Sequence, residues 1–149
     1  MKLRLLVVGR MVPELAEYEA RFRKRLSGAC SLQVIELAEG RSKQLAQRKQ
    51  EEEKHILKVV KGNFILFDER GKTLGSTQWA RYLQHLPGNA EQDFVIGGAS
   101  GVSAVIHAKA GHIWSLSLLT LPHQLARVMV VEQLYRAWSI TQGHPYHRE

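Results

Sequence analysis

The sequence is poor in the residues that crosslink a chain or anchor it in a membrane. Cys30 is its single cysteine, so neither an internal disulfide nor a zinc site with a second thiolate can form. No apolar run approaches the roughly 20 residues that span a bilayer. Residues 1–9 form a short apolar stretch interrupted by charge, and acidic residues follow it in place of a small-residue cleavage site, which favours a first strand over a signal peptide. These features predict a cytoplasmic protein with no membrane partner.

Negative charge is also scarce. The sequence has 14 Asp and Glu and 21 Lys and Arg, which gives a net charge of +7 and a pI near 9.8. Such an excess attracts polyanions, and nucleic acid first among them, although a merely soluble basic protein has the same composition. Arg41, Lys43, Arg48 and Lys49 are either RNA contacts or part of a solvated helix face, and Glu51-Glu52-Glu53 is expected on such a face.

Length and patterning predict one domain over residues 1–149, without repeats or linkers. Apolar runs alternate with amphipathic ones from end to end, which is typical of an α/β fold with a mostly parallel sheet of five or six strands and helices on both faces. The expected strands are residues 3–8, 32–37, 63–68, 94–96 and 113–117. The expected helices are residues 13–26, 42–61, 76–86, 103–109 and about 122–142, and a turn is expected over 68–72.

Three of the expected strands end in unusual sequence, and ligands bind at the carboxyl ends of strands in such sheets. Residues 67–72, 97–101 and 117–122 could therefore wall one pocket. The run Gly97-Gly98-Ala99-Ser100-Gly101 is neither a dinucleotide fingerprint nor a Walker A loop. It either lets backbone approach a ligand or makes a tight turn. Residues 118–121 either leave the sheet and offer backbone amides, or extend the strand or the next helix.

The C-terminal tail is unusually rich in aromatic and basic residues for a chain end. His144 and His147 lack a third ligand, so no metal site is expected. His147 and Arg148 are suited to holding a phosphate or a nucleobase, with Tyr146 as a stacking surface. The alternative is a surface tail that happens to be aromatic. Trp79 and Trp114 are expected to be core anchors.

Several segments closely resemble the bacterial ribosomal RNA large subunit methyltransferase H family. The likeness extends over the whole chain and is strongest in FVIGGASGVS (residues 94–103), WSLSLLTLPH (114–123), LYRAWSI (134–140) and HPYHRE (144–149). That resemblance implies a SPOUT-type domain with a C-terminal trefoil knot and a homodimer. It also implies S-adenosylmethionine bound in the knot, and methylation of N3 of a pseudouridine in helix 69 of 23S rRNA, on the assembled ribosome.

The resemblance also implies roles for particular residues. Tyr146, His147 and Arg148, with Arg136, would face the substrate as the catalytic group, and no metal is implied. Ala99-Ser100 stands where some relatives have Pro-Glu, so a carboxylate there is not essential, and Phe67 stands where relatives often have leucine. The cofactor pocket would be formed by Phe67, Gly98, Ser117, Leu118, Leu119, Thr120, Leu121 and Pro122.

Two other classes of protein compete with this interpretation. A non-catalytic ribosome-binding factor would use the same basic surface without a cofactor. A nicotinamide or flavin oxidoreductase would share the sheet, but the first turn after a strand, residues 9–13, lacks the dinucleotide fingerprint. Binding of S-adenosylmethionine discriminates the methyltransferase from both.

Overall fold

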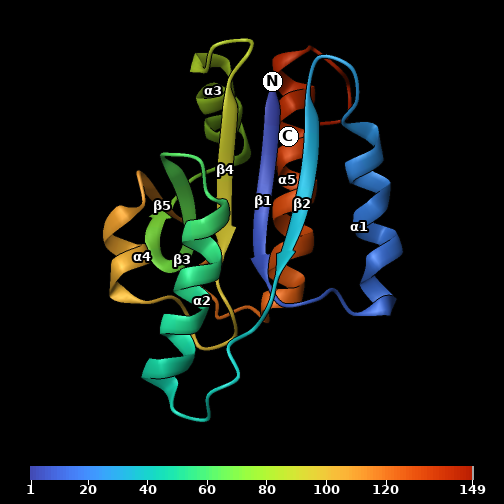
Figure 1. Cartoon of the computed structure of the whole chain (residues 1–149). Helices are drawn as coiled ribbons and strands as arrows, with labels where there is room; N and C mark the ends of the chain where they lie inside the picture. Colours follow the sequence, from blue (N-terminus) through green and yellow to red (C-terminus); the bar gives the residue numbers. More distant parts are fainter. Residues whose placement is uncertain (149) are drawn as a thin grey trace.

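Five parallel strands form a single sheet in the computed structural model, which describes residues 1–148 (Figure 1). The strand order is β2-β1-β4-β3-β5, and every neighbouring pair is parallel. The predicted α/β fold with a parallel sheet is therefore confirmed. The strands are β1 (Lys2–Val8), β2 (Ser31–Leu37), β3 (Phe64–Thr73), β4 (Glu91–Ile96) and β5 (His112–Ser115). The helices are α1 (Pro13–Arg25), α2 (Leu45–Val59), α3 (Ser76–His85), α4 (Ala104–Lys109) and α5 (His123–Thr141).

Helices cover both faces of the sheet, as predicted. Alternate residues of β1 point to opposite faces, so Leu5 joins a core with α1, α3 and α5, whereas Leu6 joins a second core with α2 and α4. Both side chains are fully buried. Burial on two faces explains why residues 5–8 of β1 and 94–96 of β4 are continuously apolar in sequence. Trp79 and Trp114 are 3% and 4% exposed in the first core, which confirms them as core anchors.

The third strand differs from its prediction. A turn was expected over residues 68–72, but β3 continues to Thr73, with an irregularity in its pairing with β5 between Phe67 and Lys72. A Cβ on Gly71 would lie 2.6 Å from the Ile113 carbonyl oxygen, so only glycine permits the close approach of the two strands there. Such a bulge displaces a segment from the regular ladder. Here the displaced segment, residues 68–70, lies beside the cavity described below.

A buried cation joins three elements. The Arg127 guanidinium of α5 donates to both carboxylate oxygens of Glu19 on α1, at 2.6 and 2.9 Å, and to Glu36 on β2 at 2.6 Å. The side chains of Arg127 and Glu19 are only 5% and 3% exposed. Burial alone would raise the pKa of Glu36, but hydrogen bonds from Arg127 and the Met11 amide outweigh it and lower that pKa.

Removing this cation should destabilise the protein strongly. Arg127→Ala leaves the buried Glu19 carboxylate without its partner, and we expect a loss of about 3–5 kcal/mol in the free energy of unfolding. Urea denaturation followed by circular dichroism measures it. The control is Lys61→Ala, because Lys61 and Glu91 are 3.6 Å apart and both well exposed, and such a surface pair contributes less than about 1 kcal/mol. Equal losses in the two variants would contradict the assignment.

Candidate active site

A cavity of about 680 Å³ opens at the carboxyl ends of β3, β4 and β5. Its volume is in the range of sites for small molecules and cofactors. The three segments predicted to wall one pocket all contribute to it, and Lys49 of α2 joins them. Among the predicted cofactor residues, those that line the cavity are Phe67, Gly98, Ser117, Leu119, Thr120, Leu121 and Pro122. Leu118 is 94% exposed and is not part of the lining.

The glycine loop after β4 is both a tight turn and a wall of the cavity. The Gly101 amide donates to the Gly98 carbonyl at 3.0 Å, and Gly101 has φ +84°, which favours glycine. A Cβ on Gly98 would lie 2.9 Å from Oε1 of Glu52 and 3.3 Å from Val8. A side chain at position 98 would therefore displace the Glu52 carboxylate, through which α2 packs against this loop.

Helix α2 holds this loop through side chains that sequence patterning missed. The Arg48 guanidinium donates to Ser100 Oγ at 2.8 Å, and Ser103 Oγ donates to Glu53 at 2.6 Å. Glu52 accepts the Gly40 amide at 2.9 Å and is 6% exposed, so its expected place on a solvated face was wrong. The pattern misled because three consecutive carboxylates are usually solvated.

Residues 116–122 leave the sheet as an irregular loop, which resolves the alternative left open by the sequence. Serine hydroxyls give the loop its shape: Ser115 Oγ donates to the Ser117 carbonyl at 2.8 Å, and Ser117 Oγ accepts the Leu119 amide at 2.9 Å. Thr120 Oγ1 then donates to Glu69 at 3.2 Å, which joins this loop to the bulge of β3. Two walls of the cavity are thus connected directly.

Phe67 forms an aromatic wall that buried neighbours hold in place. Its ring stacks on Trp79 with centroids 5.4 Å apart and meets Trp114 edge-on at 6.3 Å. Because Trp79 and Trp114 are core residues, the Phe67 ring is fixed at the floor of the cavity. A fixed, flat apolar wall is suited to a planar heterocycle.

The bulge of β3 adds charges of both signs to the cavity. Asp68 accepts hydrogen bonds from the Arg70 amide at 2.8 Å and from the Arg70 guanidinium at 3.1 and 3.2 Å. The guanidinium bond is the main reason why the pKa of Asp68 is lowered, so this carboxylate stays ionised at neutral pH. Together with Lys49 in the lining, Asp68 offers partners to a ligand that carries both an amine and a carboxylate.

A second cluster, the tail cluster, joins Tyr146 and His147 of the tail to Glu132 and Arg136 of α5. Nη1 of Arg136 lies 3.2 Å from Nδ1 of His147, and the Arg136 guanidinium lies over the Tyr146 ring at 4.8 Å. Glu132 accepts from the Tyr146 hydroxyl at 2.9 Å and from Arg136 at 2.6 Å. Burial, with the bond to Glu132, raises the pKa of Tyr146 to about 12. Sequence analysis missed Glu132, although its i,i+4 spacing from Arg136 is a helical ion-pair signal.

One chain does not bring the two clusters together. Arg136 is 10 residues along α5 from Ala126, the last α5 residue that lines the cavity, which corresponds to about 15 Å at ~1.5 Å per residue. None of Arg136, Tyr146, His147 and Arg148 lines the cavity. Figure 1 shows α5 starting at the end of the sheet where the strands finish and running toward the end where β1 begins. Glu149 lies outside the described residues.

Within residues 1–148, no group of three or more His, Cys, Asp or Glu side chains is placed to hold a metal ion. No helix in the same range has both the length and the apolar character needed to cross a membrane.

Comparison with known proteins defines the class first. Residues 1–147 match the family model described as predicted SPOUT methyltransferase. A probable methylase family protein from Haemophilus influenzae Rd KW20 superposes with a TM-score of 0.59 at 10% identity, over 99% of this chain and 70% of that one. A structure described as addressing 2-OH methylation of C/U34 on tRNA gives 0.52 at 15% identity, over 96% and 98%. At such identities these two structures support the fold alone.

Relatives that are similar in sequence define the family within this class. Proteins named ribosomal RNA large subunit methyltransferase H are 42% identical in Hydrogenovibrio crunogenus, with all of both chains covered, and 40% identical in Rhizobium meliloti, with 99% of each covered. The relative of that name in Clostridium acetobutylicum is 36% identical, over 99% of this chain and all of its own. The chain belongs to the ribosomal RNA large subunit methyltransferase H family of SPOUT methyltransferases.

The contact between Gly98 and Glu52 predicts a defined coupling. Gly98→Ala should cost about 1–3 kcal/mol, because the new methyl group overpacks the space against Glu52 and Val8. Combining it with Glu52→Ala, which removes the nearest atoms, should recover part of that loss in a double-mutant cycle. Thermal and urea unfolding measure the loss of stability in the single variants and its recovery in the double variant. Gly88→Ala is the control, since a Cβ there meets nothing within 4 Å, and strict additivity of the first two changes would contradict the packing.

Proposed function

We propose that this chain uses S-adenosylmethionine to methylate N3 of a pseudouridine in helix 69 of 23S rRNA, on the assembled ribosome. The observation that carries the proposal is the cavity that Phe67, the glycine loop and residues 117–122 form at the strand ends, in a chain of this family. The names of the relatives support large-subunit rRNA as the substrate. The net charge of +7 supports a polyanionic partner.

The lining fits the proposed methyl donor. The flat Phe67 ring and the apolar Leu119 and Leu121 suit an adenine, while the charges of Lys49 and Asp68 suit the amino acid part. S-adenosylmethionine supplies an electrophilic methyl group on a sulfonium. The chain's own contribution is to hold it rigidly, since positioning supplies much of the acceleration in such a displacement. No metal is needed for this chemistry.

The tail cluster supplies the groups that face the base. N3 of the pseudouridine loses its proton when it is methylated, and His147 or solvent accepts that proton. Tyr146 is not the acceptor, because a phenol whose pKa is raised to about 12 stays protonated at neutral pH. We expect its ring instead to stack on or orient a base. Arg136 and the exposed Arg148 stabilise an anionic base or hold a phosphate.

A homodimer explains how the separated clusters meet. Leu125 and Met129 are 45% and 38% exposed and lie one turn apart on α5, and the same face continues to Glu132 and Arg136. A twofold, antiparallel contact along this face brings the tail of one protomer toward the start of α5 in its partner. The start of α5 adjoins the cavity, through Pro122 and His123. Exposed Leu118 extends the apolar area beside it.

Transfer of a labelled methyl group tests the activity. Wild-type protein with labelled S-adenosylmethionine should modify a pseudouridine of intact ribosomes that lack the helix 69 methyl group, and should modify protein-free 23S rRNA much less. Digestion and mass spectrometry locate the label. A folded protein that binds S-adenosylmethionine but labels neither substrate points to a different RNA target. Absence of cofactor binding as well points to a non-catalytic ribosome-binding factor.

Mixed dimers test whether two protomers share a site. Deletion of residues 147–149 should abolish transfer but keep cofactor binding, whereas Thr120→Trp should block the cavity of an otherwise intact chain. Each homodimer should be inactive. Random mixing makes half of the dimers mixed, each with one intact site, so about a quarter of wild-type turnover should return. If the mixture stays inactive although subunit exchange is shown by mass spectrometry, each protomer works with its own tail.

A further inference from the structure

Four cations lie in and just before the first turns of α2. Arg41 and Lys43 are in the loop that leads into the helix and are exposed, whereas Arg48 and Lys49 are half-buried on the helix itself. We call these four residues the α2 rim. None of them makes an ion pair within 4.0 Å to any carboxylate of residues 1–148. The rim is therefore a group of cations that the chain itself does not neutralise by direct contact.

The neighbouring carboxylates accept hydrogen bonds from two backbone amides and a serine hydroxyl. Glu51 accepts the Arg41 amide at 2.6 Å, Glu52 accepts the Gly40 amide at 2.9 Å, and Glu53 accepts the Ser103 hydroxyl at 2.6 Å. These hydrogen bonds hold the loop before α2 and the glycine loop in place. Glu39 is the remaining carboxylate of the segment and is exposed, so one exposed anion accompanies the two exposed cations Arg41 and Lys43.

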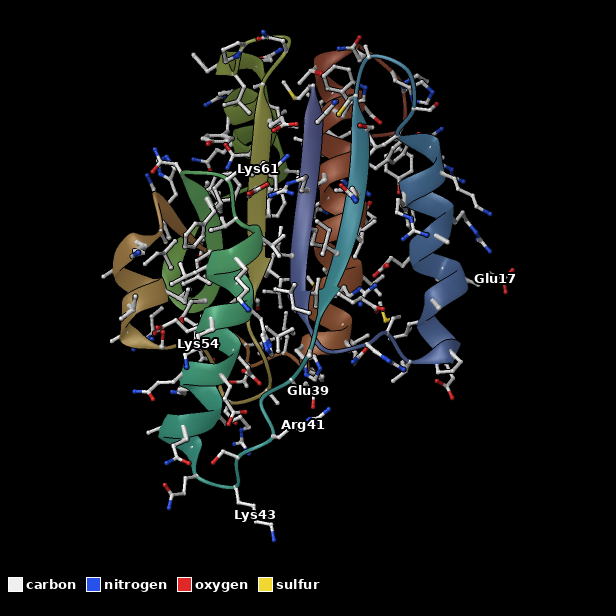
Figure 2. All side chains as sticks on the ribbon, viewed as in Figure 1. Glu17, Glu39, Arg41, Lys43, Lys54 and Lys61 are labelled. Atoms are coloured by element: carbon white, nitrogen blue, oxygen red, sulfur yellow. The ribbon has the colours of Figure 1, made fainter. Side chains whose placement is uncertain are left out.

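The α2 rim adjoins the cavity through Arg48 and Lys49. Lys49 is part of the cavity lining, and Arg48 donates to Ser100 of the glycine loop. Figure 2 shows Arg41 and Lys43 projecting outward from the loop between β2 and α2, whereas Lys61 lies near the opposite end of α2. Arg41 and Lys43 therefore lie in the segment just before the helix that supplies Lys49 to the cavity lining.

We propose that the α2 rim holds the phosphate backbone of the RNA substrate beside the cavity. The identity of the substrate as RNA rests on the proposed function; the rim itself rests on its charge and position. Lysine and arginine side chains on exposed loops bind phosphates without reading sequence, and they fix the register of a polyanion on a protein. The α2 rim lies on the cavity wall that α2 supplies, so it positions the RNA independently of the tail cluster.

Removing the two exposed rim charges should weaken RNA binding in a salt-dependent way. Each phosphate contact contributes roughly 0.7–0.9 to the slope of log K against log salt. Arg41→Gln/Lys43→Gln should therefore reduce that slope by up to about two and weaken binding roughly tenfold near 0.1 M salt. The measurement is equilibrium binding of the full chain to purified large ribosomal subunits over a series of KCl concentrations. Calorimetry with S-adenosylmethionine should give an unchanged Kd.

Two further variants control for net charge and for folding. Lys61→Gln/Arg81→Gln also removes two exposed positive charges, from the far end of α2 and from α3, and should leave most of the slope intact. Arg41→Lys/Lys43→Arg keeps both rim charges and should bind like the wild type. Equal slopes for the rim variant and the wild type, or equal losses in the two glutamine variants, overturn the proposal.

Methylation assays on the same variants distinguish a failure of the rim proposal from a failure of the proposed function. If ribosomes are methylated, the rim variant should raise KM for ribosomes and leave kcat nearly unchanged. An unchanged KM and slope, with normal methyl transfer, would refute the rim while the proposed function stands. A reduced slope in a system where even the wild type transfers no methyl group would uphold the rim and refute the function.

Discussion

Parallel pairing of β3 between β4 and β5 is the constraint on which the site depends. It puts three carboxyl ends at one edge of the sheet, so segments up to 55 residues apart in the chain, from Phe67 to Pro122, surround a single cavity. The bulge in β3 then sends Asp68 and Arg70 to the same edge. Because each wall continues directly from a strand buried on both faces, the cavity inherits the rigidity of the core.

The same rigidity limits what one chain can do. Helix α5 is fixed at its start by Gln124, which bonds to Arg10 and Val12, and along its length by the buried Arg127 network. This fixed helix keeps Arg136 ten residues, or about 15 Å, from Ala126, the last α5 residue that lines the cavity. In the proposed homodimer, the partner would supply the tail cluster through the face of α5 that also carries the exposed Leu125 and Met129.

Periodicity predicted the sheet, its parallel pairing and the convergence of three loops, because burial on two faces leaves a plain apolar signal in each strand. It did not predict the bulge in β3, since residues 68–72 have the composition of a turn and only pairing with β5 makes them a strand. It also misplaced Glu52, whose burial depends on a glycine 46 positions later in the chain. The trefoil knot concerns how the chain threads, and it stays a prediction from the family resemblance.

Helix α2 connects the two halves of the proposed chemistry. Its inward side chains, Arg48, Glu52 and Glu53, hold the glycine loop that walls the cavity, while Arg41 and Lys43 before it face solvent. A phosphate held by the rim is thereby attached to the same rigid body as the methyl donor. In the proposed reaction, this arrangement would fix the base relative to the methyl donor, because the α2 rim and the cavity wall share one helix.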